Sequence, residues 1–349
     1  MRKIFWLFFI AVIAAGGWFA WTLLSPLEPP AQTFVILHPG YSTRHIAAAL
    51  KSAGVIRNAD VFVFWQYLRP ERSLKAGEYL FEKPANILDV KHRLQSGDVY
   101  FHTVIIPEGF TMFDIARAIE AAGLGSAQDF LKVAQSDVAQ IADHAPGATS
   151  LEGYLFPDTY QFSRMLSMHE MAAAMVKQFR QVAHQIGLIQ VQTPTDGTAG
   201  DTSNSSPHIV VETDVERTVI MASIVEKETA VAEERPLVAS VYFNRLDKKI
   251  ALDADPSIIY AELLAGNYSG ALHHDDMRFN SPYNTYTHAG LPPGPIANPG
   301  KSALEAAMHP AQSAYFYFVA DAQGHHRFAS TIEEHNKNVA AYRRAVRGQ

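Results

Sequence analysis

The sequence contains no cysteine, and this absence excludes several kinds of site at once. Without a thiol the protein can have no disulfide framework, no cysteine nucleophile and no zinc site built on thiolates. A chain without thiols also suits a compartment in which free thiols would oxidise.

The sequence also lacks a surplus of basic residues. Its 29 Lys and Arg residues are outnumbered by 35 Asp and Glu residues, which gives a formal net charge of -6. Proteins that bind nucleic acids usually carry a clustered positive surplus, so we expect no nucleic-acid partner. With 349 residues, 48% of them hydrophobic, the chain is long and apolar enough for about two domains with packed cores.

Charged residues are missing from Ile4 to Leu24, where the sequence reads IFWLFFIAVIAAGGWFAWTLL. An apolar run of this length, coiled as an α-helix, spans a hydrocarbon core about 30 Å thick. Arg2 and Lys3 precede the run, and the short segment that follows carries only Glu28. The positive-inside rule therefore places residues 1–3 in the cytoplasm and the chain after the run outside.

A cleaved signal peptide is the alternative to a transmembrane helix at residues 4–24. Signal peptides usually have an apolar core of about 7–15 residues, with small residues at the cleavage site behind it. Here the small residues Ala14 to Gly17 are followed by Trp18 and Trp21 instead. We therefore predict a retained single-pass anchor in the cell inner membrane, a stiff proline-rich linker at residues 25–32, and a periplasmic remainder.

An internal repeat follows the linker. The segment VILHPGYSTRHIAAALKSAGVI at Val35–Ile56 aligns without gaps on VIIPEGFTMFDIARAIEAAGL at Val104–Leu124. Each copy predicts a strand, a glycine turn and a helix with apolar residues at helical spacing, closed by a glycine cap. The paired glycines are Gly40 with Gly109 and Gly54 with Gly123.

This pattern indicates an α+β fold. Between the two repeats we expect a strand at residues 74–81 and a helix at residues 87–97, so that residues 33–103 form a small βα module. Modules of this kind resemble the LysM-like glycan-binding units found beside cell-wall enzymes. A spacer that only separates the next domain from the membrane has the same composition and remains an alternative.

Residues 104–349 are expected to form a second, mixed α+β domain in which helices dominate. The segment TPTDGTAGDTSNSSPH at Thr193–His208 lacks apolar periodicity and is predicted to be an exposed loop insertion. A loop-rich stretch is expected to end at Pro299. Helices are predicted at residues 168–186, 215–229, 235–246 and 301–308, and a hairpin is predicted from strands at residues 314–320 and 325–330.

The predicted helix VERTVIMASIVEKET carries the strongest candidate for chemistry. Glu228 falls on its apolar side, whereas Glu226 lies near the polar boundary. Because burial disfavours a carboxylate, Glu228 is expected to have a raised pKa and to keep its proton near neutral pH, as a general acid must. The alternative is a helix-terminal acid that points into solvent or pairs with Arg235 or Lys227. The predicted polar flank consists of Glu216, Ser223 and Lys227.

Two polar segments downstream are hard to explain as packing. They are LDADPSIIYA at Leu252–Ala261 and SPYNTYTHAGLPPGPIANPG at Ser281–Gly300. Their aromatic, amide and hydroxyl groups suit contact with a sugar, and prolines stiffen the second segment, so we expect both to line a cleft. A plain proline-rich surface loop is the alternative for the second segment.

Six blocks of the sequence carry a resemblance to a known family. The blocks are LEGYLFPDTY, MASIVEKETA, VASVYFNRL, DADPSIIYA, YNTYTHAGLPPGPIANPG and HPAQSAYFYFVAD. In order and spacing they resemble those of the MltG-type, or YceG-like, endolytic murein transglycosylases. The resemblance covers nearly the whole exported chain and the anchor. The loop at residues 193–208 is longer than the family pattern, and Phe279-Asn280 also depart from it.

The resemblance implies a bitopic protein in which a LysM-like subdomain precedes a catalytic domain. It implies a lytic transglycosylase that cuts nascent peptidoglycan between MurNAc and GlcNAc, leaves a 1,6-anhydroMurNAc end and so terminates glycan elongation. The family's essential acid corresponds to the second Glu of EKET, which is Glu228. The residues that we expect to bind substrate are Tyr283, Asn284 and Tyr286, with Asp255 and Glu152 as secondary candidates.

The expected partners are glycan strands and the peptidoglycan synthases of the elongation or division machinery. No metal or other cofactor is expected, because the histidine pairs at residues 273–274 and 325–326 have no evident further ligands. Two other functions stay open. The chain could be a hydrolytic muramidase that uses Asp253 or Asp255 as a second carboxylate, or a non-catalytic glycan-binding scaffold of the cell-wall synthesis complex.

Overall fold

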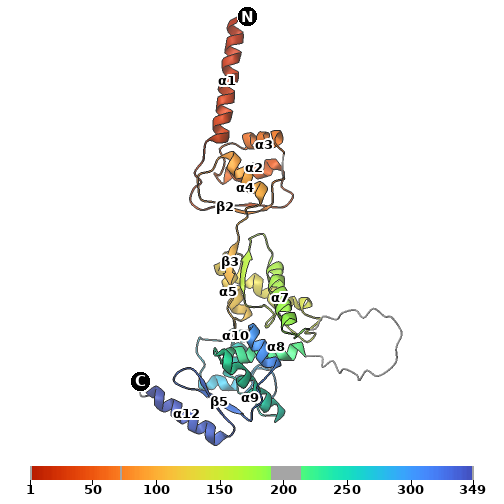
Figure 1. The fold of residues 1–349 in the computed structure, drawn as a ribbon, viewed down its shortest axis with the longest axis vertical. Coiled ribbons are helices and arrows are strands. Elements are labelled where there is room, and N and C mark those ends of the chain that lie inside the picture. Colours follow the sequence, from red (N-terminus) through yellow and green to blue (C-terminus); the bar gives the residue numbers. More distant parts are fainter. Residues whose placement is uncertain (1, 71–72, 190–213, 348–349) are drawn as a thin grey trace, which may run out of the picture. The chain divides into compact units, whose positions relative to one another are not determined.

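The computed structural model of the chain describes residues 2–70, 73–189 and 214–347 (Figure 1). The fold is mixed α+β, as the sequence predicts, and its strands form two-stranded sheets. The predicted loop insertion at residues 193–208 lies outside the described residues.

The chain divides into two compact units. Unit 1 comprises Met1–Thr103 with Gln161–Ser167, and unit 2 comprises Val104–Tyr160 with Met168–Gln349. The chain passes from one unit to the other within β3 (His102–Ile105) and β4 (Thr159–Phe162).

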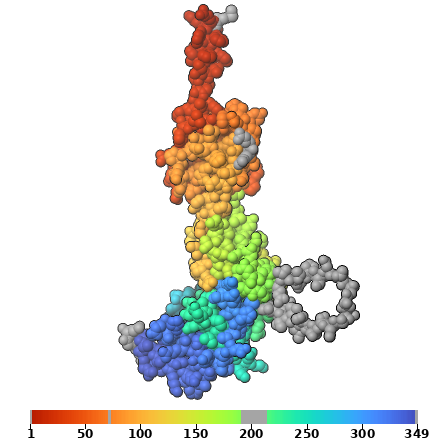
Figure 2. All heavy atoms as spheres, viewed as in Figure 1, coloured from red at the N-terminus to blue at the C-terminus, as the bar shows by residue number. Residues whose placement is uncertain are grey.

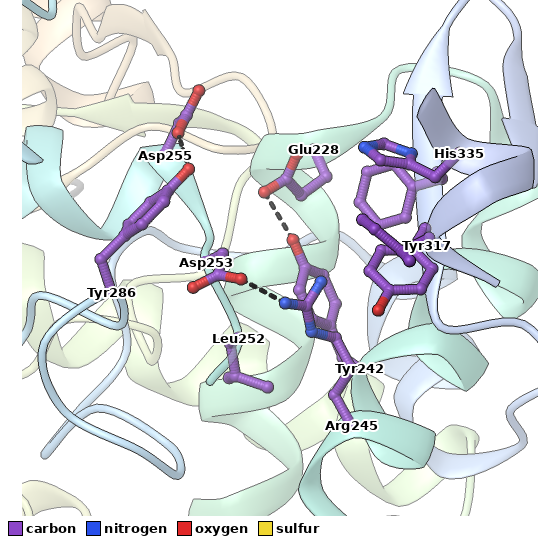
Figure 3. Close-up of a pocket in the computed structure, with 11 residues that line it drawn as sticks. Glu228, Tyr242, Arg245, Leu252, Asp253, Asp255, Tyr286, Tyr317 and His335 are labelled. Atoms are coloured by element: carbon purple, nitrogen blue, oxygen red, sulfur yellow. Dashed lines mark hydrogen bonds and ion pairs between the residues drawn. The ribbon is translucent and has the colours of Figure 1, made fainter. Parts of the chain in front are cut away.

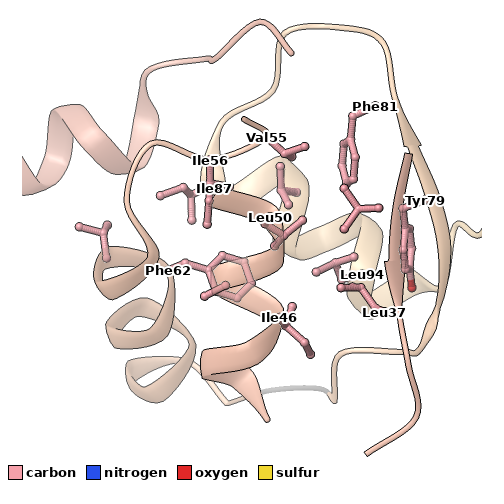
Figure 4. Close-up of a cluster of buried hydrophobic side chains, with 14 of the residues drawn as sticks. Leu37, Ile46, Leu50, Val55, Ile56, Phe62, Tyr79, Phe81, Ile87 and Leu94 are labelled. Atoms are coloured by element: carbon pink, nitrogen blue, oxygen red, sulfur yellow. The ribbon is translucent and has the colours of Figure 1, made fainter. Parts of the chain in front are cut away.

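Unit 1 packs helices on one face of a two-stranded antiparallel sheet (Figure 4). In that sheet Thr33 lies opposite Phe81 and Leu37 lies opposite Gly77. The core between the layers is apolar and includes the fully buried side chains of Leu50, Phe62 and Leu94. The elements are α1 (Arg2–Leu24), β1 (Thr33–Leu37), α2 (Thr43–Ser52), α3 (Ala59–Leu68), β2 (Gly77–Phe81) and α4 (Ile87–Ser96).

Unit 2 is mainly helical. Its helices are α5 (Met112–Ala121), α6 (Ala127–Ser136), α7 (Met168–Gln185), α8 (Val215–Glu228), α9 (Arg235–Asp247), α10 (Asp255–Ala265), α11 (Lys301–Met308) and α12 (Ile332–Arg347). Short 3-10 helices span Val138–Gln140, Ala232–Glu234 and His274–Arg278. Strands β5 (Tyr317–Ala320) and β6 (His326–Ala329) form the predicted hairpin, in which Tyr317 lies opposite Ala329.

The two copies of the internal repeat fold alike, as predicted. In the first copy β1 leads into α2, and in the second β3 leads into α5. Ser42 and Thr111 cap the two helices, since each side chain accepts a hydrogen bond from the backbone N–H three residues further on. Gly54 and Gly123 follow the helix ends with φ values of +72° and +69°, in the left-handed region that favours glycine.

The expectation of a loop-rich stretch up to Pro299 is wrong in one respect. Residues from Asp255 to Ala265 form α10, which begins with Pro256 in its first turn and ends at Gly266 in a left-handed conformation. A proline in the first turn and a glycine after the last are common signals for the start and end of a helix. The helix was missed because polar and apolar residues between them show no clear helical periodicity. The helices predicted at residues 168–186, 215–229, 235–246 and 301–308 are confirmed to within about two residues at each end.

Helix α1 is long and apolar enough to cross a membrane, and among the described helices it is the single one of that kind. Its side chains are exposed over most of its length, which the space-filling view makes plain (Figure 2). Thr22 and Leu23 near its C-terminal end are buried, where α1 contacts α3 and α4.

A substitution of Gly153, in the LEGYLFPDTY block, would test how tightly unit 2 is packed. A Cβ at this position would lie 2.5 Å from Cγ of Pro295 and 2.8 Å from Cγ1 of Val219, and its φ of +88° is left-handed. We expect Gly153→Ala to lower the free energy of unfolding by on the order of 3 kcal/mol. Gly187, with φ +77° and no atom near its absent Cβ, is the matched control.

For Gly187→Ala the expected loss is about 1 kcal/mol, from backbone strain alone. Denaturant melts of the full chain in detergent, followed by circular dichroism, would compare the two variants. Equal losses would show that Gly153 is not held closely against Pro295.

Candidate active site

Glu228 is the last residue of α8, a helix that is buried along most of its length. Helix α8 packs against α9, α10 and α11, so its position is fixed on several sides. Thr229 ends the helix in an extended conformation. The surrounding helices therefore hold the Glu228 carboxyl at one place on the rim of the buried core.

Glu228 faces a cleft of about 400 Å³. Figure 3 shows side chains from α9, from the segment before α10, and from β5 and α12 around it. The cleft is lined by Glu228, Tyr242, Arg245, Leu252, Asp253, Asp255, Tyr286, Tyr317, Phe318, Ile332 and His335. Charged groups, aromatic rings and aliphatic side chains thus meet in one hollow, which is a combination suited to a carbohydrate or another polar ligand with apolar faces.

The carboxyl of Glu228 is poised between its two protonation states near neutral pH. Its pKa is raised to about 7, chiefly by burial; a hydrogen bond from Tyr242 lowers it, and the nearby Asp255 carboxylate adds to the rise. The Tyr242 hydroxyl donates this bond to Oε1 of Glu228 at 2.6 Å. A pKa in this range is what a group needs to donate a proton and then take one back at neutral pH.

The sequence pattern predicts a raised pKa for Glu228 because Glu228 lies on the apolar side of its helix, away from a polar flank. This reason is wrong in part. Ser223, which was assigned to the polar flank of the helix, is fully buried, donates to the carbonyl of Ile220 and accepts from the N–H of Ile296. The side chain of Glu226 is also buried. Because the helix is enclosed on nearly all sides, what distinguishes Glu228 from its neighbours is the cleft that it faces.

Glu226 and Arg235 form a buried ion pair beside this site. Nη2 of Arg235 lies 2.6 Å from Oε1 of Glu226, and the backbone N–H of Gly300 donates to Oε2 at 2.9 Å. Arg235, the alternative partner that the sequence offers for Glu228, pairs with Glu226 instead. Burial raises the pKa of Glu226, and the Gly300 hydrogen bond and the Arg235 charge oppose that rise. The pair ties the end of α8 to the start of α9.

The wall opposite Glu228 carries two more carboxylates, each with its own partner. The Tyr286 hydroxyl donates to Oδ1 of Asp255 at 2.6 Å. Arg245 forms an ion pair with Asp253, and its Nε also donates to the carbonyl of Ala251 at 2.8 Å. Asp253 has a φ of +52°, a left-handed conformation that is uncommon for a residue with a side chain.

Of the five predicted substrate-binding residues, Tyr286 and Asp255 line the cleft with Glu228. The other three do not line it. Asn284 is fully buried, and its Nδ2 donates to the carbonyls of Met277 and Phe279. It therefore shapes the loop that carries Tyr286, whose N–H donates to its Oδ1.

Glu152 and Tyr283 lie in another buried group of side chains. Both oxygens of Glu152 accept from the N–H of Met112, and Nδ2 of Asn298 donates to Oε1 at 2.7 Å. Burial raises the pKa of Glu152 to about 8, against these hydrogen bonds. The ring of Tyr283 packs on that of Tyr260. These surroundings lend no support to their predicted contact with a sugar.

Sequence reasoning missed several residues of the cleft, among them Tyr242, Arg245, Tyr317 and His335. Tyr242 and Arg245 are three residues apart on α9, so they share one face of the helix, and the VASVYFNRL block contains both. A polar pair on one face of an apolar helix was the available signal. Tyr317 and His335 come from β5 and α12, and no local pattern connects them with Glu228.

The histidine pairs give no sign of a metal site. No group of three or more His, Asp or Glu residues in the described parts of the chain could hold a metal ion. His326 instead places its Nδ1 2.7 Å from Oε2 of Glu234, and His325 contacts the same carboxylate.

Tyr242 offers a test of the electrostatics of this site. We expect Tyr242→Phe to raise the pKa of Glu228 above its value of about 7, because the lost hydrogen bond stabilises the charged form. The titration of the carboxyl carbon, followed by NMR in protein labelled at glutamate, would measure the shift. Tyr286→Phe is the matched control, since Tyr286 donates to Asp255 instead; an equal shift in both variants would contradict the assignment.

The chain is similar to known proteins over most of its length. The model of the YceG-like family matches residues 35–341. A protein of Bacillus subtilis named endolytic murein transglycosylase is 31% identical over 94% of this chain and 90% of its own length. A protein of the same name from Streptococcus pneumoniae serotype 2 is 29% identical over 96% of this chain, which spans 64% of that longer protein.

A crystal structure of a YceG-like protein from Listeria monocytogenes is also similar. It shares 31% identity and a TM-score of 0.54, over 89% of this chain and 99% of the Listeria chain. The matched residues include both the repeat and the cleft around Glu228, so the chain belongs to the YceG-like family.

Proposed function

We propose that the protein is an endolytic murein transglycosylase that uses Glu228 as its general acid and base. The observation that carries this proposal is a carboxyl with a pKa of about 7 that faces a cleft and has no cationic partner among the contacts described for it. The relatives in Bacillus and Streptococcus carry the name of this activity. A lytic transglycosylase is a lyase, and its substrate is the glycan strand of peptidoglycan.

The proposed reaction needs one carboxyl group. Protonated Glu228 donates its proton to the glycosidic oxygen that links MurNAc to GlcNAc, and the bond between that oxygen and C1 of MurNAc breaks. The Glu228 carboxylate then takes the proton of the C6 hydroxyl of the same MurNAc, whose oxygen bonds to C1. The products are a 1,6-anhydroMurNAc end and a GlcNAc hydroxyl, and no water is consumed.

The nucleophile of this reaction is part of the substrate, so proximity supplies much of the rate. The protein has to hold the sugar in a bent shape and stabilise the positive charge that develops at C1. Asp255, the Tyr286 hydroxyl bound to it and the Arg245–Asp253 pair are placed around the cleft for these tasks. We propose Asp255 and Tyr286 as substrate-binding residues.

We also propose a placement in the cell. Helix α1 would cross the inner membrane with residues 1–3 in the cytoplasm and the rest in the periplasm. Residues 33–103 would be a LysM-like module, and residues 104–349 the catalytic domain. Nascent glycan strands, and the synthases of elongation or division that produce them, would be the partners, and cutting would end the growth of a strand.

A hydrolytic muramidase is the second candidate, because Asp253 and Asp255 line the same cleft as Glu228. A muramidase would use one of them to activate water or to attack C1. Asp253 is paired with Arg245, and Asp255 accepts from Tyr286. Mass spectrometry of digested glycan strands separates the two reactions, because only the transglycosylase leaves ends that lack the mass of one water.

Glu228→Gln tests the role of the proposed acid. Gln keeps the shape of the side chain but can neither donate nor take up the proton, so we expect turnover of purified glycan strands to fall at least about 100-fold. Folding and glycan binding should be retained, as checked by circular dichroism and by sedimentation with the strands.

Glu226→Gln is the matched control for this variant. It removes one partner of a buried ion pair, so we expect a loss of stability on the order of 3 kcal/mol but a much smaller loss of turnover per folded molecule. An active Glu228→Gln beside an inactive Glu226→Gln would mean that the wrong carboxyl has been assigned. If both variants stay active, the transglycosylase proposal fails.

The pH dependence of turnover gives an independent test. Burial raises the pKa of Glu228 from its ordinary 4.5 to about 7, so the protonated form, which starts the cycle, predominates below about pH 7. We therefore expect turnover at saturating substrate to fall as the pH rises through about 7. A rate that keeps increasing up to pH 9 would contradict a protonated Glu228 at the start of the reaction.

A further inference from the structure

Helix α3 exposes an apolar face that the fold of unit 1 leaves uncovered. Phe64, Tyr67 and Leu68 have exposed fractions of 52%, 82% and 51%. They lie at positions i, i+3 and i+4 of the helix and so form one stripe. Phe62 faces the other way into the core, and Val61, one turn before Phe64 on the same side as the stripe, is buried near the start of the helix. The outer stripe contributes nothing to that core.

The exposed stripe lies beside the C-terminal end of α1. The rings of Phe19 and Phe64 meet edge to face, with centroids 5.6 Å apart. Trp18 and Trp21, on the same stretch of α1, are exposed, and the guanidinium of Arg57 lies 5.1 Å above the Trp21 ring. The apolar surface of α1 therefore continues onto α3 without a polar break at the contact.

The length of α1 determines how deep in a membrane the contact between Phe19 and Phe64 would lie. Its 23 residues rise about 35 Å, some 5 Å more than a hydrocarbon core. If the helix spans the bilayer, its last turn lies among the headgroups, which is the level that Trp prefers. Phe19 is about one and a half turns from the end. Its partner Phe64 therefore falls at the boundary between headgroups and hydrocarbon.

We propose that α3 is an interfacial helix, which inserts Phe64, Tyr67 and Leu68 into the outer leaflet of the membrane that α1 crosses. Exposed aromatic and aliphatic side chains on a short helix are typical of segments that lie in the plane of the interface. Arg57, two residues before the first residue of α3, lies over the Trp21 ring and donates from Nη2 to the carbonyl of Pro26, so a cation accompanies the tryptophan at the level of the headgroups. This inference rests on the proposed anchor role of α1 and adds a second attachment of unit 1.

The absence of cysteine makes this inference directly measurable, because one introduced cysteine can carry a spin label at a chosen depth. The full chain would be reconstituted into nanodiscs of phosphatidylethanolamine and phosphatidylglycerol. Electron paramagnetic resonance would then give the collision rate of the label with a water-soluble nickel complex. The test position is Tyr67→Cys, because the Tyr67 side chain is 82% exposed.

Two further positions calibrate the measurement. Val12→Cys in the middle of α1 reports on insertion of the anchor. Ser96→Cys is the exposed reference position. Ser96 is the last residue of α4, and its carbonyl accepts a hydrogen bond from Lys75, which precedes β2. Figure 1 shows β2 at the end of unit 1 away from α1. We expect the nickel collision rate at Tyr67→Cys to be about tenfold lower than at Ser96→Cys, as exclusion of a polar solute from apolar surroundings requires.

The outcomes separate this inference from the anchor on which it depends. A protected Val12→Cys label with a Tyr67→Cys label as accessible as Ser96→Cys would leave the anchor intact and overturn the interfacial helix. An accessible Val12→Cys label would overturn both. Leu68→Glu, added to Tyr67→Cys, should raise the collision rate severalfold toward that of Ser96→Cys, whereas Leu68→Met should leave it low; equal rates in the two variants would also overturn the proposal.

Discussion

The buried ion pair between Glu226 and Arg235 determines how the end of α8 can carry two acids. Both Glu226 and Glu228 lose hydration, which raises the pKa of each. Glu226 has a cation at 2.6 Å and a backbone N–H at 2.9 Å, both of which favour its charged form. Among the described residues, Glu228 receives a hydrogen bond from the Tyr242 hydroxyl and has no cation as a partner, and so retains its proton more readily. Two acids two residues apart thus differ because of their partners, a pattern by which acid and base roles are separated in many enzymes.

Most parts of the fold that depend on local sequence are predicted correctly, and α10 is the exception. The repeat, its caps and the β5–β6 hairpin follow from residues within one short window. Residues that meet in the cleft come from α8, α9, the first residue of α10, α12, β5 and the segments before and after α10, and no window contains them together. The sequence therefore predicted three residues that line the cleft, Glu228, Asp255 and Tyr286, but not Tyr317 or His335. It also predicted a sugar contact for Glu152, whose carboxyl instead accepts hydrogen bonds from Met112 and Asn298.

The single-acid proposal and the muramidase alternative differ in what they require of Asp253 and Asp255. A base or nucleophile has to be free to accept a proton or to form a bond to C1. Asp253 is tied to Arg245, and the Tyr286 hydroxyl donates to Asp255. The negative charge of Asp255 also raises the pKa of Glu228. In the single-acid proposal the Asp255 charge would therefore help to keep Glu228 protonated, and it would also stabilise the cation that forms at C1.

The two copies of the repeat show why similar local sequences take on different tasks. In the first copy nothing lies within 4 Å of the position that a Cβ of Gly40 would occupy. In the second copy the carbonyl of Gly109 accepts from Nζ of Lys227 at 3.2 Å, and its N–H donates to the carbonyl of Asn298. Glu108, in the place that Pro39 holds in the first copy, lies 3.5 Å from Arg235.

The turn of the second copy thus contacts the end of α8, the start of α9 and the segment before α11. Glu108 in the second copy replaces Pro39 of the first, and its carboxylate adds a negative charge that faces Arg235, the cation of the buried pair. Backbone shape alone is common to both copies, so the strand, turn and helix were predictable from either. What makes the second copy a support for Glu228 is the set of groups packed against its turn, and those groups come from residues more than 100 positions later in the chain.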